Sequence, residues 1–81
     1  MVNGHSSDDA LVNAILKLIN ESSEPLETKE IEQALSKIKD LTRTKLFYRL
    51  MLLRGEGLIM GKLVGPGKGV WIWWKKQEVK K

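Results

Sequence analysis

Residues 42–74 decide the fold of this chain and read TRTKLFYRLMLLRGEGLIMGKLVGPGKGVWIWW. The first part, residues 42–55, has the spacing of an amphipathic helix, and Thr42 is suited to cap its first turn. The side expected to face a core consists of Leu46, Phe47, Leu50 and Leu53. The opposite side consists of Thr44, Lys45, Tyr48 and Leu52, with Arg49 at the margin. The helix therefore has one apolar side and one side rich in cationic and hydrogen-bonding groups.

A β-hairpin is predicted directly after this helix. Gly55 and Gly57 are expected to end the helix, because glycine adopts a positive φ without a steric penalty. Two apolar segments, 58–64 and 70–74, then flank the sequence Gly-Pro-Gly-Lys-Gly, which is typical of a turn. Together these segments indicate a two-stranded antiparallel hairpin.

Two further helices are predicted in the first half of the chain. The first begins at Ser6 or Ser7, whose hydroxyls can cap it, and ends before Pro25, which disfavours helical geometry in the preceding residue. Its apolar stripe consists of Leu11, Ala14, Ile15, Leu18 and Ile19. The second helix begins near Thr28, its expected cap, and its stripe consists of Ile31, Ala34, Leu35 and Ile38. Both stripes have the spacing of helices that pack on a common core.

Charge is divided sharply between the two halves of the chain. Residues 1–40 carry four Lys and eight Asp or Glu, a net charge of −4. Residues 41–81 carry ten Lys or Arg and two Glu, a net charge of +8. The modest overall charge of +4 therefore hides a strongly basic C-terminal half, which is typical of a protein that binds a polyanion.

Length and composition exclude several classes of protein. Eighty-one residues are expected to form one small domain, residues 8–75, with a disordered N-terminal stub at 1–7 and a basic tail at 76–81. The chain has no cysteine, which removes disulfides and thiolate metal sites and fits a reducing, cytoplasmic setting. His5 is the only histidine, so we expect no metal site. Neither a signal peptide nor a membrane-spanning segment is predicted.

Enzymatic activity is not expected either. The glycine-rich stretch 61–68 lacks the spacing of a phosphate-binding loop, and no Ser or Thr follows its lysine. The acidic pairs near residues 8 and 27 are explained by anions at helix starts, and no nucleophile accompanies them. We therefore expect no catalytic residues and no cofactor.

The order of the predicted elements resembles the winged helix-turn-helix family of DNA-binding proteins. Residues 26–35, LETKEIEQAL, are similar to the second helix of that family. A second similarity lies where the recognition helix of the family is followed by its wing. The apolar and glycine residues there have a spacing that this chain matches with Leu50, Leu53, Gly57, Leu58 and Ile59. The resemblance covers most of the chain and implies an α+β fold of three helices followed by a two-stranded β-hairpin wing. These matches are mainly core and turn positions, so they specify the fold better than the target.

The resemblance also implies a DNA-binding mode. Helix 42–55 would lie in the major groove, and the wing, residues 58–74, would lie along the backbone. The residues best placed to face the groove are Thr44, Lys45 and Tyr48. Arg43 would reach a phosphate or a guanine edge, and Arg49 a phosphate. Lys62 and Lys68 would serve the wing, and the amides near Thr28 and Lys29 would add a phosphate contact.

Two groups within the family are the nearest comparisons. The Z-DNA-binding domains are similar in outline, with Tyr48 at a suitable place on the third helix. This chain has Thr44 where their asparagine is expected, and Gly69-Val70-Trp71 where they have a proline-rich wing, which weighs against left-handed DNA. By size and composition the chain is more similar to the small winged-helix regulators of archaea and their viruses and plasmids.

Alternation along the last predicted strand divides its tryptophans between two faces. One face carries Val70, Ile72 and Trp74, and the other carries Trp71 and Trp73. Because a single hairpin has one buried side, we expect some indole surface to remain exposed. An exposed tryptophan beside Lys62, Lys75 and Lys76 would contact DNA sugar and phosphate, or a second subunit.

The sequence thus predicts a sequence-specific, double-stranded DNA-binding transcription regulator that acts at a promoter or operator. A homodimer, formed in solution or only on DNA, would multiply the specificity of one short recognition helix. Two alternatives stay open. The chain would be a protein-interaction module if the Trp-rich hairpin, with Met51 and Leu52, docked a partner. It would be a nucleic-acid coating protein if it bound all sequences equally.

Overall fold

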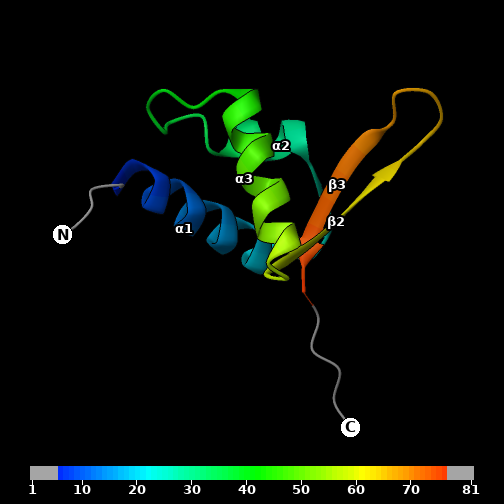
Figure 1. The fold of residues 1–81 in the computed structure, drawn as a ribbon, viewed down its shortest axis with the longest axis horizontal. Coiled ribbons are helices and arrows are strands. Elements are labelled where there is room, and N and C mark those ends of the chain that lie inside the picture. The colour runs from blue at the N-terminus through cyan, green and yellow to red at the C-terminus, as the bar shows by residue number, and fades with distance from the viewer. Residues whose placement is uncertain (1–5, 77–81) are drawn as a thin grey trace, which may run out of the picture.

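The computed structural model describes residues 6–76, with side chains from Ala10 onward. The elements run in the order α1 (Ser6–Glu21), β1 (Leu26–Glu27), α2 (Thr28–Ala34), α3 (Arg43–Gly55), β2 (Ile59–Val64) and β3 (Val70–Lys75) (Figure 1). Within the described residues the fold is α+β, with three helices and a three-stranded antiparallel sheet. This arrangement is compatible with a winged-helix-like fold.

The sheet has one strand more than the sequence predicted. Its order is β1-β3-β2, so the hairpin strands β2 and β3 are joined by the short strand β1 on the other side of β3. Leu26 pairs with Trp73, and Glu27 pairs with Ile72. The prediction of a two-stranded wing is therefore wrong, although the hairpin itself is confirmed. A strand of two residues has no alternation to recognise, and its partner lies more than forty residues away in sequence.

The first helix agrees with its predicted bounds, and the second does not. Helix α1 begins at Ser6 and ends at Glu21, before Pro25. The N-cap of α2 is Glu27 and not Thr28, and the Glu27 backbone N–H donates to Glu30 Oε1 at 2.7 Å. Helix α2 ends at Ala34, whose side chain is exposed, so the predicted stripe to Ile38 is wrong in its second half. Leu35, Ile38 and Leu41 nevertheless pack against the core from the turns that follow.

Both ends of α3 agree with the sequence. The Thr42 hydroxyl accepts a hydrogen bond from the Lys45 backbone N–H at 3.1 Å, which confirms the predicted cap. At the other end, the Leu58 N–H donates to the Leu53 carbonyl, and the Gly57 N–H donates to the Arg54 carbonyl, each at 3.0 Å. This pair of bonds is a Schellman motif, which requires the positive φ of 81° at Gly57.

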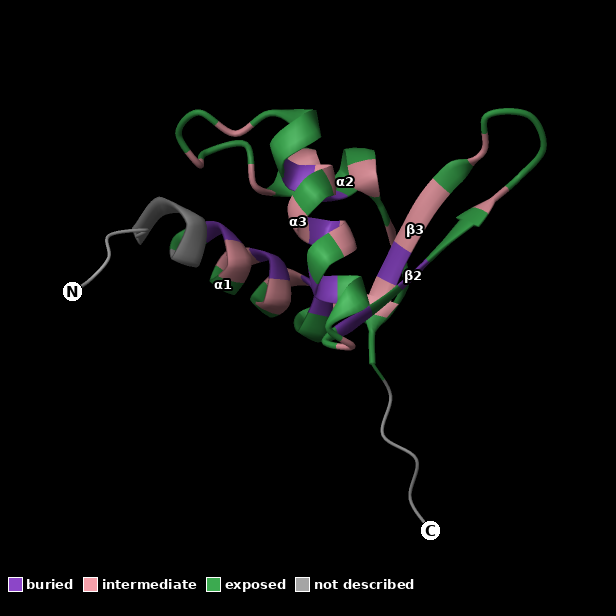
Figure 2. Ribbon diagram, in the orientation of Figure 1, coloured by how far each residue is buried: buried purple, intermediate pink, exposed green. Residues whose placement is uncertain are grey.

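The core lies where α1, α2, α3 and the inner face of the sheet meet (Figure 2). Its most deeply buried side chains are Ile15, Ile19, Ile31, Leu46, Leu50, Ile59 and Trp73. Trp73 is the largest of them, and its cross-strand neighbour on β2 is Gly61. A Cβ atom at Gly61 would lie only 2.4 Å from Trp73 Cε3. Position 61 therefore requires glycine, because the indole ring of Trp73 occupies the space that a side chain would take.

We predict that Gly61→Ala destabilises the fold by about 1–3 kcal/mol, because the indole or the strand must move to admit a methyl group. Urea unfolding followed by circular dichroism measures this change. The matched control is Gly55→Ala, where a Cβ would meet nothing within 4 Å and a helical glycine is replaced. We expect the control to stabilise by about 0.5–1 kcal/mol. Equal unfolding midpoints for the two variants would contradict the packing argument.

Candidate nucleic-acid interface

The solvent side of α3 is the surface that the sequence singled out. Thr44, Lys45 and Tyr48 are all exposed, and Tyr48 has a relative accessible surface of 60%. Leu46, Leu50 and Leu53 are buried on the opposite side. The division follows from the helical period, since the buried residues recur every three or four positions. The predicted faces of this helix are therefore confirmed.

Several cations on α3 are held by neighbouring groups. Lys45 Nζ donates to the Asp40 carbonyl at 3.1 Å, and Arg43 Nε forms an ion pair with Glu32 Oε1 on α2. The Arg49 guanidinium lies 5.7 Å from the centroid of the Tyr48 ring, within the range of a cation–π interaction. These contacts orient the basic side chains while leaving them at the surface. The ion pair of Arg43 also lowers the positive potential at the start of α3.

The last residue of the hairpin turn and the first residues of β3 share a hollow with the start of α3, while the tip of the turn extends away from the helices (Figure 1). Gly69, Val70 and Trp71 line a hollow of about 360 Å³ together with Arg43 and Phe47 of α3 and residues 27–29 at the start of α2. The structure thus brings Thr28, Lys29 and Arg43 to one groove, and Lys68 is in the turn that borders it. The turn is made possible by the positive φ angles of Gly65, Gly67 and Gly69, which are 93°, 64° and 69°.

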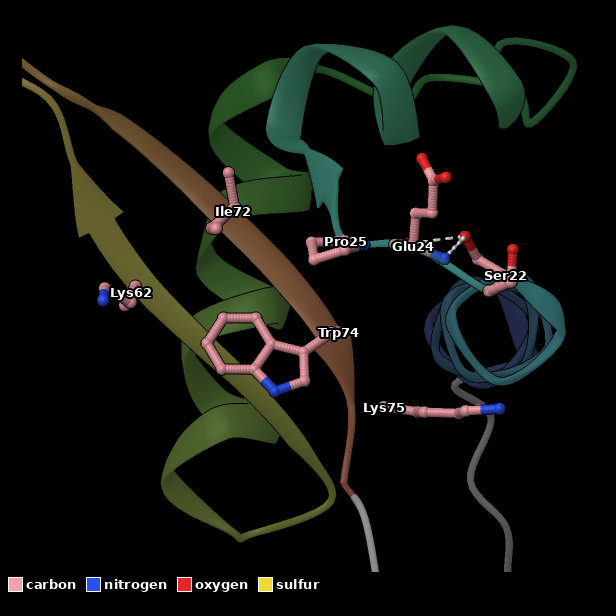
Figure 3. A pocket seen from close by; sticks show the side chains of 8 residues that line it. Ser22, Glu24, Pro25, Lys62, Ile72, Trp74 and Lys75 are labelled. Atoms are coloured by element: carbon pink, nitrogen blue, oxygen red, sulfur yellow. Dashed lines mark hydrogen bonds between the residues drawn. The ribbon is translucent and has the colours of Figure 1, made fainter.

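Lys62 is not part of this groove. It pairs with Ile72 across the hairpin, and both residues line a pocket with Trp74 on the outer face of the sheet (Figure 3). The inner face carries the buried Trp73, which packs with α3. Successive side chains of a strand point to opposite faces, so Lys62 and the solvent side of α3 belong to different surfaces. The sequence places both Lys62 and Lys68 in the hairpin, but it does not show that they lie on different surfaces.

Thr28 has a structural contact that the sequence did not reveal. Its hydroxyl accepts a hydrogen bond from Trp73 Nε1 at 2.8 Å, across 45 positions of sequence. The indole N–H is the one polar group of this fully buried side chain, so an acceptor is needed. Thr28 therefore joins β3 to the start of α2, in addition to lining the groove.

Arg54 was missed as a residue that positions the hairpin. Its Nε donates to the Gly61 carbonyl at 2.8 Å, and its guanidinium lies 5.5 Å from the centroid of the Trp71 ring. The side chain thus ties the end of α3 to both hairpin strands. A basic residue in the last helical turn is expected for its interaction with the helix dipole, so no feature of the sequence indicated this second role.

The tryptophans of the inner face form an aromatic cluster instead of an apolar surface patch. Trp71 and Trp73 stack with their ring centroids 5.2 Å apart, and Phe47 of α3 meets both rings edge-on at 5.8 and 5.9 Å. Trp73 is fully buried and Trp71 is half-buried. Of the hairpin tryptophans that the interaction-module alternative would use, Trp73 therefore offers no accessible surface to a partner.

Other kinds of site find no support in the part of the chain that the structure describes. Among residues 6–76 there is no group of three or more His, Cys, Asp or Glu side chains arranged to hold a metal ion. Within the same residues, each helix is too short or too polar to cross a bilayer. Comparison with models of protein families and with curated proteins finds no match for this chain.

We predict that Thr28→Val destabilises the protein by about 1–3 kcal/mol, because the Trp73 N–H would be left buried without an acceptor. Valine has nearly the same shape as threonine, so packing changes little. Thr28→Ser is the matched control, since it keeps the hydroxyl and removes a methyl group. Chemical unfolding measures both. If Thr28→Val and Thr28→Ser lower the free energy of unfolding equally, the hydrogen bond makes no contribution beyond that of packing.

Proposed function

We propose that this protein is a winged-helix transcription regulator that binds double-stranded DNA through α3, with the hairpin turn against the backbone. The observation that carries the proposal is the combination of an exposed polar helix face, Thr44, Lys45 and Tyr48, with a hairpin that shares a hollow with the start of the same helix and extends its turn outward (Figure 1). A helix fits the major groove of B-DNA, which is about 12 Å wide, and a flanking turn can then reach the backbone.

The side chains on the solvent side of α3 have the chemistry of base-edge contacts. Lysine donates to guanine O6 and N7, and threonine contacts either a polar base edge or the thymine methyl group. The Tyr48 hydroxyl is exposed and adds a donor and an acceptor. Lys45 is held by the Asp40 carbonyl, so it starts from a restricted position. These residues are the candidates for reading sequence.

Residues around the α3 groove supply phosphate contacts. Lys29 and Arg43 line it, and Lys68 projects from the adjacent turn. Each lysine or arginine that neutralises a phosphate releases condensed counterions, so affinity falls as salt rises. The net charge of +8 in residues 41–81 supports this mode, since it gives long-range attraction to any duplex.

We predict that Lys45→Ala and Tyr48→Ala each weaken binding to a specific duplex by about 1–3 kcal/mol, and weaken binding to random DNA less. Lys68→Ala should weaken both duplexes alike and reduce the salt slope by about 1. A footprint on the DNA upstream of its own gene identifies the duplex, and titrations at two salt concentrations measure affinity. Lys17→Ala, at an exposed position on α1, removes one charge as a control.

Each outcome of these titrations decides a part of the proposal. Binding that is absent, or indifferent to salt, would reject duplex recognition. Equal losses on specific and random DNA from all three variants would reject sequence reading and favour nucleic-acid coating. A constitutive complex with another protein in sedimentation, with no fluorescence response to DNA, would favour the interaction module, for which the exposed Tyr48 and Leu52 are available.

We also predict that Glu32→Gln strengthens duplex binding by roughly 0.2–1 kcal/mol at low salt, because it releases Arg43 from a partly exposed ion pair. The same titration measures the change, and the gain should shrink as salt rises. Glu56→Gln is the control, since it removes one negative charge at the far end of α3. A gain of the same size in both variants would show that net charge, and not release of Arg43, is responsible.

A further inference from the structure

A second pocket lies on the face of the sheet opposite α3. It has a volume of about 400 Å³ and lies between residues 22–25, which follow α1, and the outer faces of β2 and β3 (Figure 3). Ile72 and Trp74 of β3 and Lys62 of β2 contribute to it, and Lys75 closes one end. The binding mode proposed for α3 uses none of these side chains.

The walls of this pocket are fixed by the fold. The register of the hairpin sets Lys62 opposite Ile72 and Met60 opposite Trp74. The pairing of β1 with β3 holds residues 22–25 beside the sheet. Within that loop, the Ser22 hydroxyl donates to the Glu24 carbonyl at 2.7 Å and accepts from the Glu24 N–H at 3.4 Å. The register of the strands and the hydrogen bonds of the loop therefore define the shape of the pocket.

The chemistry of the pocket combines an aromatic surface with two cations. The half-buried Trp74 offers an indole face, and Ile72 and Pro25 provide apolar walls. Figure 3 shows the Lys62 and Lys75 ammonium groups on either side of the Trp74 ring, and the Glu24 carboxylate turned away from it. An aromatic platform flanked by lysines is the combination that binds unpaired bases together with their phosphates.

We propose that this pocket binds one unpaired nucleotide of a single-stranded nucleic acid, with its base stacked on Trp74. The phosphates before and after that nucleotide contact Lys62 and Lys75. A strand fits better than a free mononucleotide, because the two cations lie on opposite sides of the ring and a mononucleotide has only one phosphate end. The site is separate from the α3 surface, so it stands whether or not α3 binds duplex DNA.

The test is a titration of the full chain, labelled with ¹⁵N, with an oligothymidylate of about eight nucleotides, a length within the usual range of single-strand sites. We expect shifts at the Trp74 indole N–H and at residues 22–25. Trp74→Ala should weaken binding by about 5- to 150-fold, the range for loss of one stacked base, while Trp74→Phe keeps most of the affinity. Circular dichroism checks that both variants fold.

Matched lysines separate the pocket from general attraction. Lys62→Ala should weaken single-strand binding several-fold more than Lys68→Ala, which removes the same charge from the exposed turn. Lys45→Ala on α3 should weaken single-strand binding no more than Lys68→Ala does, while it weakens specific duplex binding, so that failure here is distinguishable from failure of duplex binding. The proposal is overturned if Lys62→Ala and Lys68→Ala lose equal affinity for the oligonucleotide. It is also overturned if the oligonucleotide does not shift the resonance of the Trp74 indole N–H. Equally strong binding of polyglutamate or of thymidine monophosphate at Trp74 would also overturn it.

Discussion

The burial of Trp73 is the constraint on which the rest of the structure depends. Its ring fills the space between the sheet and the helices, and its N–H needs an acceptor, which is Thr28 at the start of α2. The same ring requires Gly61 opposite it on β2. Leu26 of β1 is its neighbour on the other side. One side chain thus fixes the place of both neighbouring strands and of the second helix.

The position of the hairpin relative to α3 follows from this constraint. Once Trp73 is buried, alternation also turns Trp71 inward, where both rings meet Phe47. Arg54 then bridges α3 to Gly61 and Trp71. The packing of β3 thus places its first residues against the start of α3. A surface that combines this helix with this hairpin is therefore a product of the core.

The same alternation gives the sheet a second surface with a different character. Ile72 and Trp74 point away from α3 because Trp71 and Trp73 point toward it. Lys62 lies on the same face, because it is paired directly with Ile72 across the hairpin. The basic residues of the C-terminal half consequently divide between two faces, one with the exposed polar side of α3 and one with the half-buried indole of Trp74. Charge alone could not have shown this division.

The elements that could be predicted from the sequence are those whose signals are local. The cap at Thr42, the apolar side of α3, the Gly57 terminus and the glycine-rich turn all depend on residues within a few positions of one another. Thr44, Lys45 and Tyr48 were predicted as exposed for the same reason. The third strand, the Thr28–Trp73 hydrogen bond, the role of Arg54 and the face on which Lys62 lies became visible only in the folded chain. Each of these features depends on a contact between residues distant in sequence, or on which side of the sheet packs on the core. The periodicity of apolar residues within one segment contains information about neither.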